Sequence, residues 1–319
     1  MALTDDDRRR LYHYMRLSRA VEDAAWALSS QGRMVGRLYT GHGQEAIPVG
    51  AGAALGPDDV IAPMYRDMGM HLIRGVEPLE IFAQYLGKRE SNNYGKDSGL
   101  HIGDMSRGIV GMISVLPDSL PVAVGVALAF KIRKETRVAL TTFGEGAAST
   151  GAFHEAMNMA AVLQVPIVLV CENNGWALST PTNKEYAGKG IVARAEGYGM
   201  PGIQVDGNDV EAVHAAVSEA AERARTGNGP TLIECLTFRM RGHSIIDAAH
   251  YVPSQDREAW AKKDPIERQR KRLEEAGLWD ADQEAALEET LRVQIEDAIA
   301  QSQTMDDPLP EDAHTGVFA

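Results

Sequence analysis

Residues 138–174, VALTTFGEGAASTGAFHEAMNMAAVLQVPIVLVCENN, indicate the fold class of this chain. The apolar runs at 138–143 and 166–171 predict two strands, because each is short and continuous and ends in polar residues. Between them, residues 151–163 carry apolar side chains on one side, which predicts a helix. A strand, a helix and a second strand, with both strands apolar on two faces, are typical of a parallel sheet covered by helices.

The same pattern continues on both sides of this stretch. Further strands are expected at 60–63, 202–207 and 231–238. The Ala-rich segment 209–226 predicts a helix between the last two strands. We therefore predict an α/β fold, in which helices cover both faces of a parallel sheet and helical extensions lie at the N-terminus and the C-terminus.

Three parts of the chain are distinguished in this prediction. Residues 1–35 are a helical segment, which Thr4 is placed to cap. Residues 36–253 form the α/β domain, and residues 254–319 form a charged helical arm with an acidic tail. Within the domain, the polar and glycine-rich stretch 88–107 is longer than most connections, and such a loop is usually functional or disordered.

Composition excludes several classes of function. The chain has 319 residues and a net charge of −13, whereas nucleic-acid binding requires a basic face, so we expect no nucleic-acid partner. No apolar run approaches the roughly 20 residues that span a bilayer, so we expect no membrane partner. The start MALTDDDRRR does not have the apolar segment of a secretory signal. Cys171 and Cys235 lie in apolar runs, and reduced core thiols fit a cytoplasmic protein.

Polar residues follow two strands of the expected sheet. Glu145 lies between Gly144 and Gly146 after the first strand, and Asn174 follows the second. Ligands bind at the carboxyl ends of parallel strands, so these side chains meet at a binding site if the strands are neighbours. A carboxylate and an amide oxygen suit Mg²⁺, and the glycines allow a diphosphate to approach the backbone. Each motif alone is also a common turn; the combination and its spacing favour the cofactor site.

Four longer motifs connect this site to a known family. In chain order they are FGEGAAS (143–149), NNGWALSTPT (173–182), GYGMPGIQVDGNDV (197–210) and RGHS (241–244). Over roughly residues 8–270 the chain resembles the alpha subunit of the thiamine-diphosphate-dependent first component, the decarboxylase, of 2-oxo acid dehydrogenase complexes. The branched-chain type is the most similar.

The resemblance implies a set of site residues. Mg²⁺ would be held by Glu145, Asn174 and the backbone carbonyl of Trp176. His243 would be the active-site histidine; a single loop histidine is usually only solvated, but its place after a strand and beside Arg239 favours a catalytic role. The residues implied to bind thiamine diphosphate are Tyr65, Arg66, Ser114, Leu116, Gly144, Glu145, Gly146, Ala147, Asn174, Trp176, Arg239 and His243.

The resemblance also implies the reaction and the partners. The reaction is oxidative decarboxylation of a branched-chain 2-oxo acid or pyruvate, with transfer of the acyl group to a lipoyl acyltransferase. Because no second parallel-sheet pattern follows residue 254, the domain that activates the cofactor must come from a beta subunit, in an α2β2 heterotetramer. An acetoin dehydrogenase alpha subunit is the alternative within the family. A non-catalytic Rossmann-like subunit is the alternative from another class, although Ser149 stands where its third glycine is needed.

Several positions are left open by the sequence. Tyr39 stands where some relatives carry a histidine, and His42 follows three residues later. His101 either faces the active site or only anchors the long loop. Ser244 matches a phosphorylation position of some relatives, and a K⁺ site around Ser114 is a further open question.

The metal site gives a first prediction. Glu145→Ala should abolish the Mg²⁺-dependent binding of thiamine diphosphate, because one carboxylate carries most of the protein charge at the cation. Titration of the cofactor with and without Mg²⁺ measures this effect. Unchanged affinity in the variant would remove Glu145 from the site.

Overall fold

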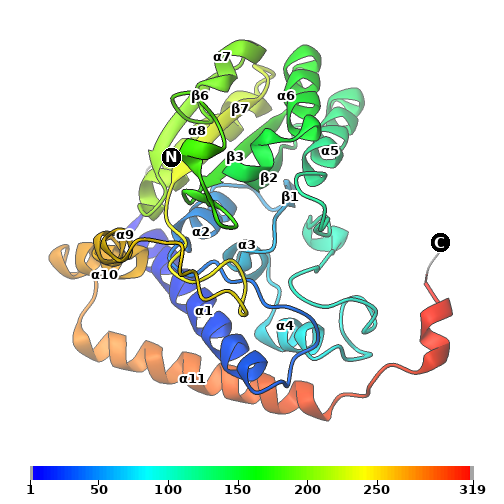
Figure 1. The fold of residues 1–319 in the computed structure, drawn as a ribbon, viewed down its shortest axis with the longest axis vertical. Coiled ribbons are helices and arrows are strands. Elements are labelled where there is room, and N and C mark those ends of the chain that lie inside the picture. Colours follow the sequence, from blue (N-terminus) through cyan, green and yellow to red (C-terminus); the bar gives the residue numbers. More distant parts are fainter. Residues whose placement is uncertain (1–2, 317–319) are drawn as a thin grey trace.

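A five-stranded parallel sheet forms the centre of the computed structural model, which describes residues 3–316 (Figure 1). All its pairings are parallel, and the strand order is β1-β2-β3-β7-β6. The strands are β1 (Val60–Ala62), β2 (Ala139–Gly144), β3 (Ile167–Asn173), β6 (Gly202–Asp206) and β7 (Thr231–Leu236). A small antiparallel hairpin, β4 (Trp176–Ala177) and β5 (Thr180–Pro181), follows β3. All five predicted strands of the sheet are confirmed, with ends that differ by at most two residues.

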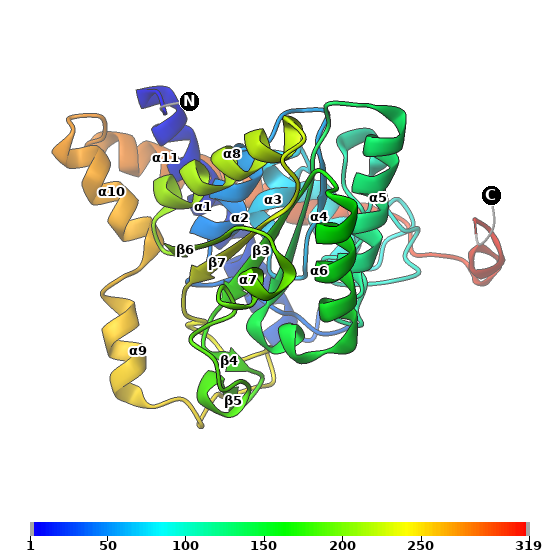
Figure 2. The same cartoon turned by 90° about the horizontal axis from the view of Figure 1, so that it is seen from above.

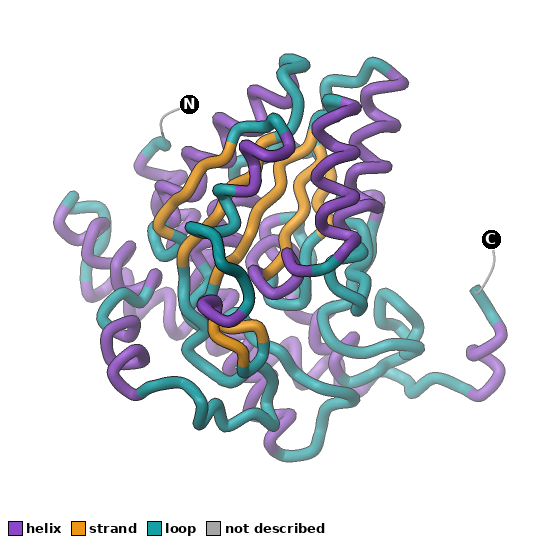
Figure 3. The backbone as a smooth tube through the Cα atoms, turned by 45° about the horizontal axis from the view of Figure 1, so that its top comes forward, coloured by secondary structure: helices purple, strands orange, loops and turns teal. Residues whose placement is uncertain are grey.

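Helices cover both faces of this sheet, as predicted (Figures 2 and 3). The helices are α1 (Asp5–Ser30), α2 (Ala46–Ala53), α3 (Met68–Ile73), α4 (Pro78–Tyr85), α5 (Ser119–Arg133), α6 (Gly151–Leu163), α7 (Arg194–Tyr198), α8 (Val210–Arg225), α9 (Ser254–Ala261), α10 (Pro265–Glu275) and α11 (Ala281–Thr304). Helices α1, α2, α3 and α8 share one apolar core with the sheet, and α5 and α6 share a second core on the opposite face.

Strand β3 shows why both faces are apolar. Its side chains alternate, so that Val168 and Val170 enter the core with α2 and α8, whereas Leu169 and Cys171 enter the core with α5 and α6. Burying a side chain of this size stabilises the fold by roughly 1.5–3 kcal/mol. The two cysteines are buried and free, as the sequence predicted for core thiols.

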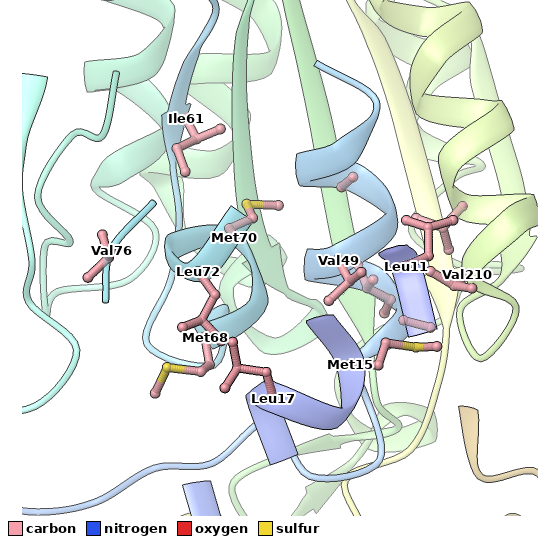
Figure 4. Packing of buried hydrophobic residues seen from close by; sticks show 14 of the residues in the cluster. Leu11, Met15, Leu17, Val49, Ile61, Met68, Met70, Leu72, Val76 and Val210 are labelled. Atoms are coloured by element: carbon pink, nitrogen blue, oxygen red, sulfur yellow. The ribbon is translucent and has the colours of Figure 1, made fainter. Parts of the chain in front are cut away.

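The larger core joins the N-terminal helix to the sheet (Figure 4). Leu11, Met15 and Leu17 of α1 pack in the same cluster as Val49 of α2 and Val210 of α8. The beginning of α1 is capped as predicted, because the Thr4 side chain accepts from the Asp7 amide and the Asp7 carboxylate accepts from the Thr4 amide.

The C-terminal arm packs back onto this core. Leu287, Leu291 and Ile295 of α11 belong to the same cluster, and α11 lies along α4 and α1 (Figure 1). Arg19 of α1 also forms ion pairs with Glu45 at 2.7 Å and with Asp264 at 2.6 Å. The helical character of the arm is therefore confirmed, while the boundaries at 35 and 253 remain a prediction about domains.

Two connections carry residues toward the carboxyl ends of the strands. Residues 88–104 are irregular and end in a 3₁₀ turn at Met105–Arg107, so the long loop of the sequence prediction is confirmed. Helix α3, which the sequence analysis did not predict, begins two residues after Arg66, with Asp67 as its N-cap. In the part of the chain that the structure describes, no helix is both long enough and apolar enough to cross a membrane.

A buried carboxyl group on α1 predicts a pH-dependent stability. Glu22 is 2% exposed and accepts from the Gly41 amide at 2.7 Å, and burial together with Glu45 raises its pKa to about 8. Protonated Glu22 therefore stabilises the folded state. This contribution to the free energy of unfolding is complete below the ordinary pKa of 4.5 and is lost as the pH rises through about 8.

Glu22→Gln should remove this part of the pH dependence. Between pH 5 and pH 8.5 we expect the free energy of unfolding to fall by about 2–4 kcal/mol more in the parent protein than in the variant. Urea unfolding at the two pH values measures the difference, with Glu288→Gln on the exposed side of α11 as the control. Parallel pH profiles for parent and Glu22→Gln would contradict the assignment.

Candidate active site

The carboxyl ends of β2 and β3 place the two predicted metal ligands together. The two strands are paired in register up to Gly144 and Glu172, so the residues that follow them are neighbours. The Asn174 amide donates to Glu145 Oε2 at 3.0 Å, and the Trp176 amide donates to Asn174 Oδ1 at 3.2 Å. Glu145 and Asn174 are 1% and 5% exposed. The expectation that these residues meet is therefore confirmed.

A cavity of about 310 Å³ opens beside this pair. Of the residues predicted to bind the cofactor, all except Ser114 line it. The lining residues are Met64, Tyr65, Arg66, Leu116, Gly144, Glu145, Gly146, Ala147, Thr150, Asn174, Trp176, Ala177, Leu178, Arg239 and His243. Glycine is required at one of these positions, because a Cβ on Gly146 would lie 2.4 Å from the Ala177 Cβ.

The donor set of the cavity fits a magnesium diphosphate. The carboxylate of Glu145, the amide oxygen of Asn174 and the carbonyl of Trp176 are hard oxygen ligands, which Mg²⁺ prefers. Among residues 3–316, His, Cys, Asp and Glu form no group of three that could hold a metal, and the predicted ligands beside Glu145 differ from such a group because they include an amide and a backbone oxygen. Burial raises the pKa of Glu145, and a bound cation would oppose that rise.

Arg239 joins this site to the loop after β7. It is 4% exposed, and its Nη2 donates to the Leu178 carbonyl at 2.9 Å and to the Tyr251 hydroxyl at 2.8 Å. Its Nη1 is 3.3 Å from the Trp176 carbonyl, the predicted backbone ligand of the metal. A carbonyl oxygen has two lone pairs and can accept from Arg239 and bind a cation together.

His243 contacts the second guanidinium of the cavity. Arg66 Nη2 donates to the His243 carbonyl at 3.0 Å and lies 3.2 Å from His243 Nδ1. Because a guanidinium can only donate, Nδ1 accepts, and the neutral ring carries its proton on Nε2. Burial, together with the positive charges of Arg66 and Arg239, lowers the pKa of His243 to about 4.

A carboxylate fixes the backbone at His243. Asp247 Oδ2 accepts from the His243 amide at 2.7 Å and from the Tyr251 hydroxyl at 2.6 Å. The same hydroxyl accepts from Arg239, so one hydrogen-bonded chain orients both Arg239 and the segment that carries His243. The sequence analysis missed Asp247 and Tyr251, because only the folded loop brings them against Arg239.

Ser114 lies in a second cavity of about 380 Å³. Tyr65, Leu116 and His243 line both cavities, so the two are adjacent. Tyr39 also lines the second cavity, with its ring 5.3 Å from the His243 ring and 4.8 Å from the Tyr65 ring.

The fold places the two histidines whose roles were open, His42 and His101, in different surroundings. His101 lines the second cavity, which favours the active-site alternative for this residue. His42 is absent from the lining of both cavities, and its ring nitrogen lies 3.8 Å from an Asp23 carboxylate oxygen.

Four residues that line the cavity beside Glu145 were not predicted as site residues: Met64, Thr150, Ala177 and Leu178. Thr150 had a signal in the sequence, because a threonine before an apolar helical segment is a typical N-cap; it caps α6 by accepting from the Phe153 amide. Leu178 had none, since its backbone lies at a positive φ of 54° in the hairpin turn and its carbonyl meets Arg239 through tertiary packing.

The fold and the site together define a cofactor-dependent α/β enzyme, and comparison with known proteins identifies its family. The family model described as the dehydrogenase E1 component matches residues 12–311, and the chain belongs to this family.

Individual relatives match this chain over nearly its whole length. Over 322 residues the chain is 36% identical to the 2-oxoisovalerate dehydrogenase subunit alpha of Bacillus subtilis (strain 168), covering 100% of this chain and 97% of the relative. The mitochondrial human protein of that name is 39% identical over 312 residues, which cover 97% of this chain and 70% of the relative. The pyruvate dehydrogenase E1 component subunit alpha of Porphyra purpurea is 33% identical over 316 residues, 97% of this chain and 92% of the relative.

These matches confirm several predictions. The chain is the alpha subunit of a 2-oxo acid dehydrogenase E1 component, an oxidoreductase of a thiamine-diphosphate-dependent family. An alpha subunit implies a beta subunit as its partner. The family match also favours this interpretation over the Rossmann-like alternative.

The ionisation of His243 gives a prediction for the subunit itself. With a pKa of about 4, its ring should show no titration between pH 5.5 and pH 8. Arg66→Ala removes one of the neighbouring positive charges and should raise the pKa, although burial keeps it below the ordinary 6.5. Ring-proton chemical shifts in an NMR titration measure both effects, with Arg133→Ala on the exposed side of α5 as the control. A pKa near 6.5 in the parent chain would contradict the assignment.

Proposed function

We propose that the cavity beside Glu145 and Asn174 binds thiamine diphosphate together with Mg²⁺. The observation that carries this proposal is the convergence of two oxygen ligands and two guanidiniums, Arg66 and Arg239, on one cavity at the ends of β2 and β3. The arginines would hold the diphosphate oxygens, and Glu145, Asn174 and the Trp176 carbonyl would hold the cation. Tyr65, Leu116, Gly144, Gly146 and Ala147 would complete the cradle.

The bound cofactor would supply the nucleophilic carbon and the electron sink that decarboxylation of a 2-oxo acid requires. The chain supplies a charged binding site. His243, with its proton on Nε2, would donate a hydrogen bond toward the reacting oxygen, while Arg66 fixes its tautomer. Leu116, in the wall between the two cavities, would exclude water from the reacting end.

The partners of the reaction follow from the same proposal. The activating carboxylate would come from the beta subunit in an α2β2 heterotetramer, so the alpha chain alone should be inactive. The acyl group would pass to a lipoyl acyltransferase. We also propose a cytoplasmic location, which the two free, buried thiols Cys171 and Cys235 support.

For the substrate we propose a branched-chain 2-oxo acid. Support comes from the names of the relatives, since several of the most similar ones are 2-oxoisovalerate dehydrogenase subunits. The test is co-purification of the chain with its beta subunit, followed by decarboxylation assays with 2-oxoisovalerate and pyruvate and a carbon–carbon cleavage assay with acetoin. Preference for pyruvate or acetoin would overturn the proposed substrate and leave the cofactor site intact.

His243→Ala separates catalysis from binding. Thiamine diphosphate affinity should stay within about twofold, because the predicted metal and diphosphate contacts come from other residues. Turnover to a lipoyl acceptor should fall by on the order of 10²–10⁴, the range for a positioned acid–base group. The measurement uses the complex with its beta subunit, with His214→Ala on α8 as the control.

Arg66→Ala provides the contrast. It should raise the concentration of thiamine diphosphate needed for half-saturation and should also lower the maximal rate, since Arg66 orients His243. If His243→Ala lost activity only through weaker cofactor binding, the histidine would be a diphosphate ligand and its catalytic role would be wrong.

A further inference from the structure

A separate cavity, of about 330 Å³, lies at the beginning of β1. Gly56 and Pro57, which precede β1, line it, whereas Tyr65 and Arg66, which follow β1, line the cavity at the ends of β2 and β3. Its other walls come from α1, the end of α2, the end of α3 and the 3₁₀ turn at Met105–Arg107. The volume lies at the lower end of the range for small-molecule sites, roughly 300–1,000 Å³.

The charged side chains of this cavity are all positive. Arg10, Arg74 and Arg107 line it, and among residues 3–316 no Asp or Glu does so. In the same described part of the chain, no carboxylate oxygen lies within 4.0 Å of a guanidinium nitrogen of Arg10 or Arg74. Asp59, whose charge acts on Arg74, already accepts from two nitrogens of Arg225, at 3.1 and 2.7 Å. Two positive charges are therefore left without a contacting counter-ion beside one cavity, in a chain with a net charge of −13.

Part of the Arg74 guanidinium lacks a partner. Its Nη1 donates to the carbonyls of Gly56 at 3.0 Å and Pro57 at 3.2 Å, which fixes the group against the segment before β1. Within the described residues, its Nε and Nη2 are shielded from water and have no hydrogen-bond partner. These two nitrogens form the side of a guanidinium that donates to two oxygens of one anion. Buried donors without partners are unfavourable, and burial lowers the pKa of Arg74, so an anion in the cavity would oppose both effects.

Arg107 and an aliphatic wall complete the cavity. Arg107 pairs with Glu80 through Nη1 at 2.9 Å and with Asp104 through Nε at 3.5 Å, so neither pair uses its Nη2. It therefore adds a hydrogen-bond donor to the cavity more than it adds net charge. The remaining wall is largely aliphatic and includes Ala53, Leu55, Pro57 and Ile73. A ligand that fits both parts has a head with two negative charges and a compact apolar body.

We propose that this cavity binds a small phosphate monoester, with its phosphoryl group on the three arginines and its organic part against the aliphatic wall. A phosphate monoester carries close to two negative charges at neutral pH, which match the two guanidiniums without counter-ions. Its oxygens also match the planar donor fork of arginine. The inference goes beyond the proposed function and does not depend on it, because this cavity shares no lining residue with the two cavities described above.

Calorimetric titration of the full chain with phenyl phosphate tests the proposal. We expect a Kd of about 1 mM or lower, with weaker binding of inorganic phosphate, which lacks the apolar part, and of benzoate, which has one negative charge. Arg74→Gln should weaken the binding of phenyl phosphate by about 10–100-fold, the range for hydrogen bonds to a charged group. Arg10→Gln should weaken it by only about 2–5-fold, because Arg10 is exposed to solvent.

Two further variants and a spectroscopic readout locate the bound phosphate. Arg133→Gln, on the exposed side of α5, is the matched control and should bind phenyl phosphate as the parent chain does. Arg66→Ala, in the cavity at the ends of β2 and β3, should also keep the affinity of the proposed site. In ¹⁵N NMR of the arginine side chains, the Nε signal that Arg74→Gln removes should shift when phenyl phosphate is added to the parent chain.

The outcomes separate this inference from the proposed function. If Arg66→Ala abolishes the binding of phenyl phosphate while Arg74→Gln and Arg10→Gln leave it unchanged, the phosphate lies in the other cavity and the inference is wrong. Absence of saturable binding in the parent chain, or equal affinity for inorganic phosphate, would also overturn it, and neither result bears on decarboxylation by the complex. If Arg74→Gln fails to fold, Arg10→Gln decides the question, since Arg10 forms no ion pair within residues 3–316 and its loss spares the core.

Discussion

The backbone pairing of β2 with β3 is the constraint on which the site depends. Two parallel strands in register end side by side, so Glu145 and Asn174 leave the sheet as neighbours although 28 residues lie between them. The hydrogen bond from the Asn174 amide to Glu145 joins the two strand ends directly. Helix α6, packed in the core with α5, connects the two strands. The register of the strands is constrained by this core, because a slip by one residue would move every side chain to the opposite face.

Charge in the site is arranged around this pair. Arg66 and Arg239 both line the cavity, and they come from two distant parts of the chain, the turn before α3 and the loop after β7. The burial of the ring and these positive charges lower the pKa of His243, so the arrangement that would hold the proposed anionic cofactor also keeps the neighbouring imidazole neutral. Because burial weakens screening by solvent, these two positive charges act strongly inside the cavity although the chain has a net charge of −13.

The long loop depends on parts of the chain that lie far away in the sequence. The Arg89 amide donates to the Asp306 carbonyl at 2.9 Å, and Lys88 pairs with Asp307 at 2.7 Å, so the segment after α11 lies against the loop that carries His101 (Figure 1). Each surface ion pair contributes only about 0–1 kcal/mol, and the position of the loop therefore reflects several weak contacts. Because this loop lines the second cavity, the C-terminal arm that packs against the loop helps to position that part of the site.

Local patterns in the sequence determined the sheet, the capped helix after Thr4, and the strand-end residues Glu145 and Asn174, because hydrophobic period and capping act over a few residues. Family motifs then implied a set of cofactor-binding residues, all of which except Ser114 line the cavity beside Glu145. The tertiary structure alone decided the contacts between distant loops: Arg66 with His243, Arg239 with Tyr251, and the division into two cavities that places Ser114 beside His101. These contacts have no local signal, because irregular segments carry no period and are positioned by the elements against which they pack.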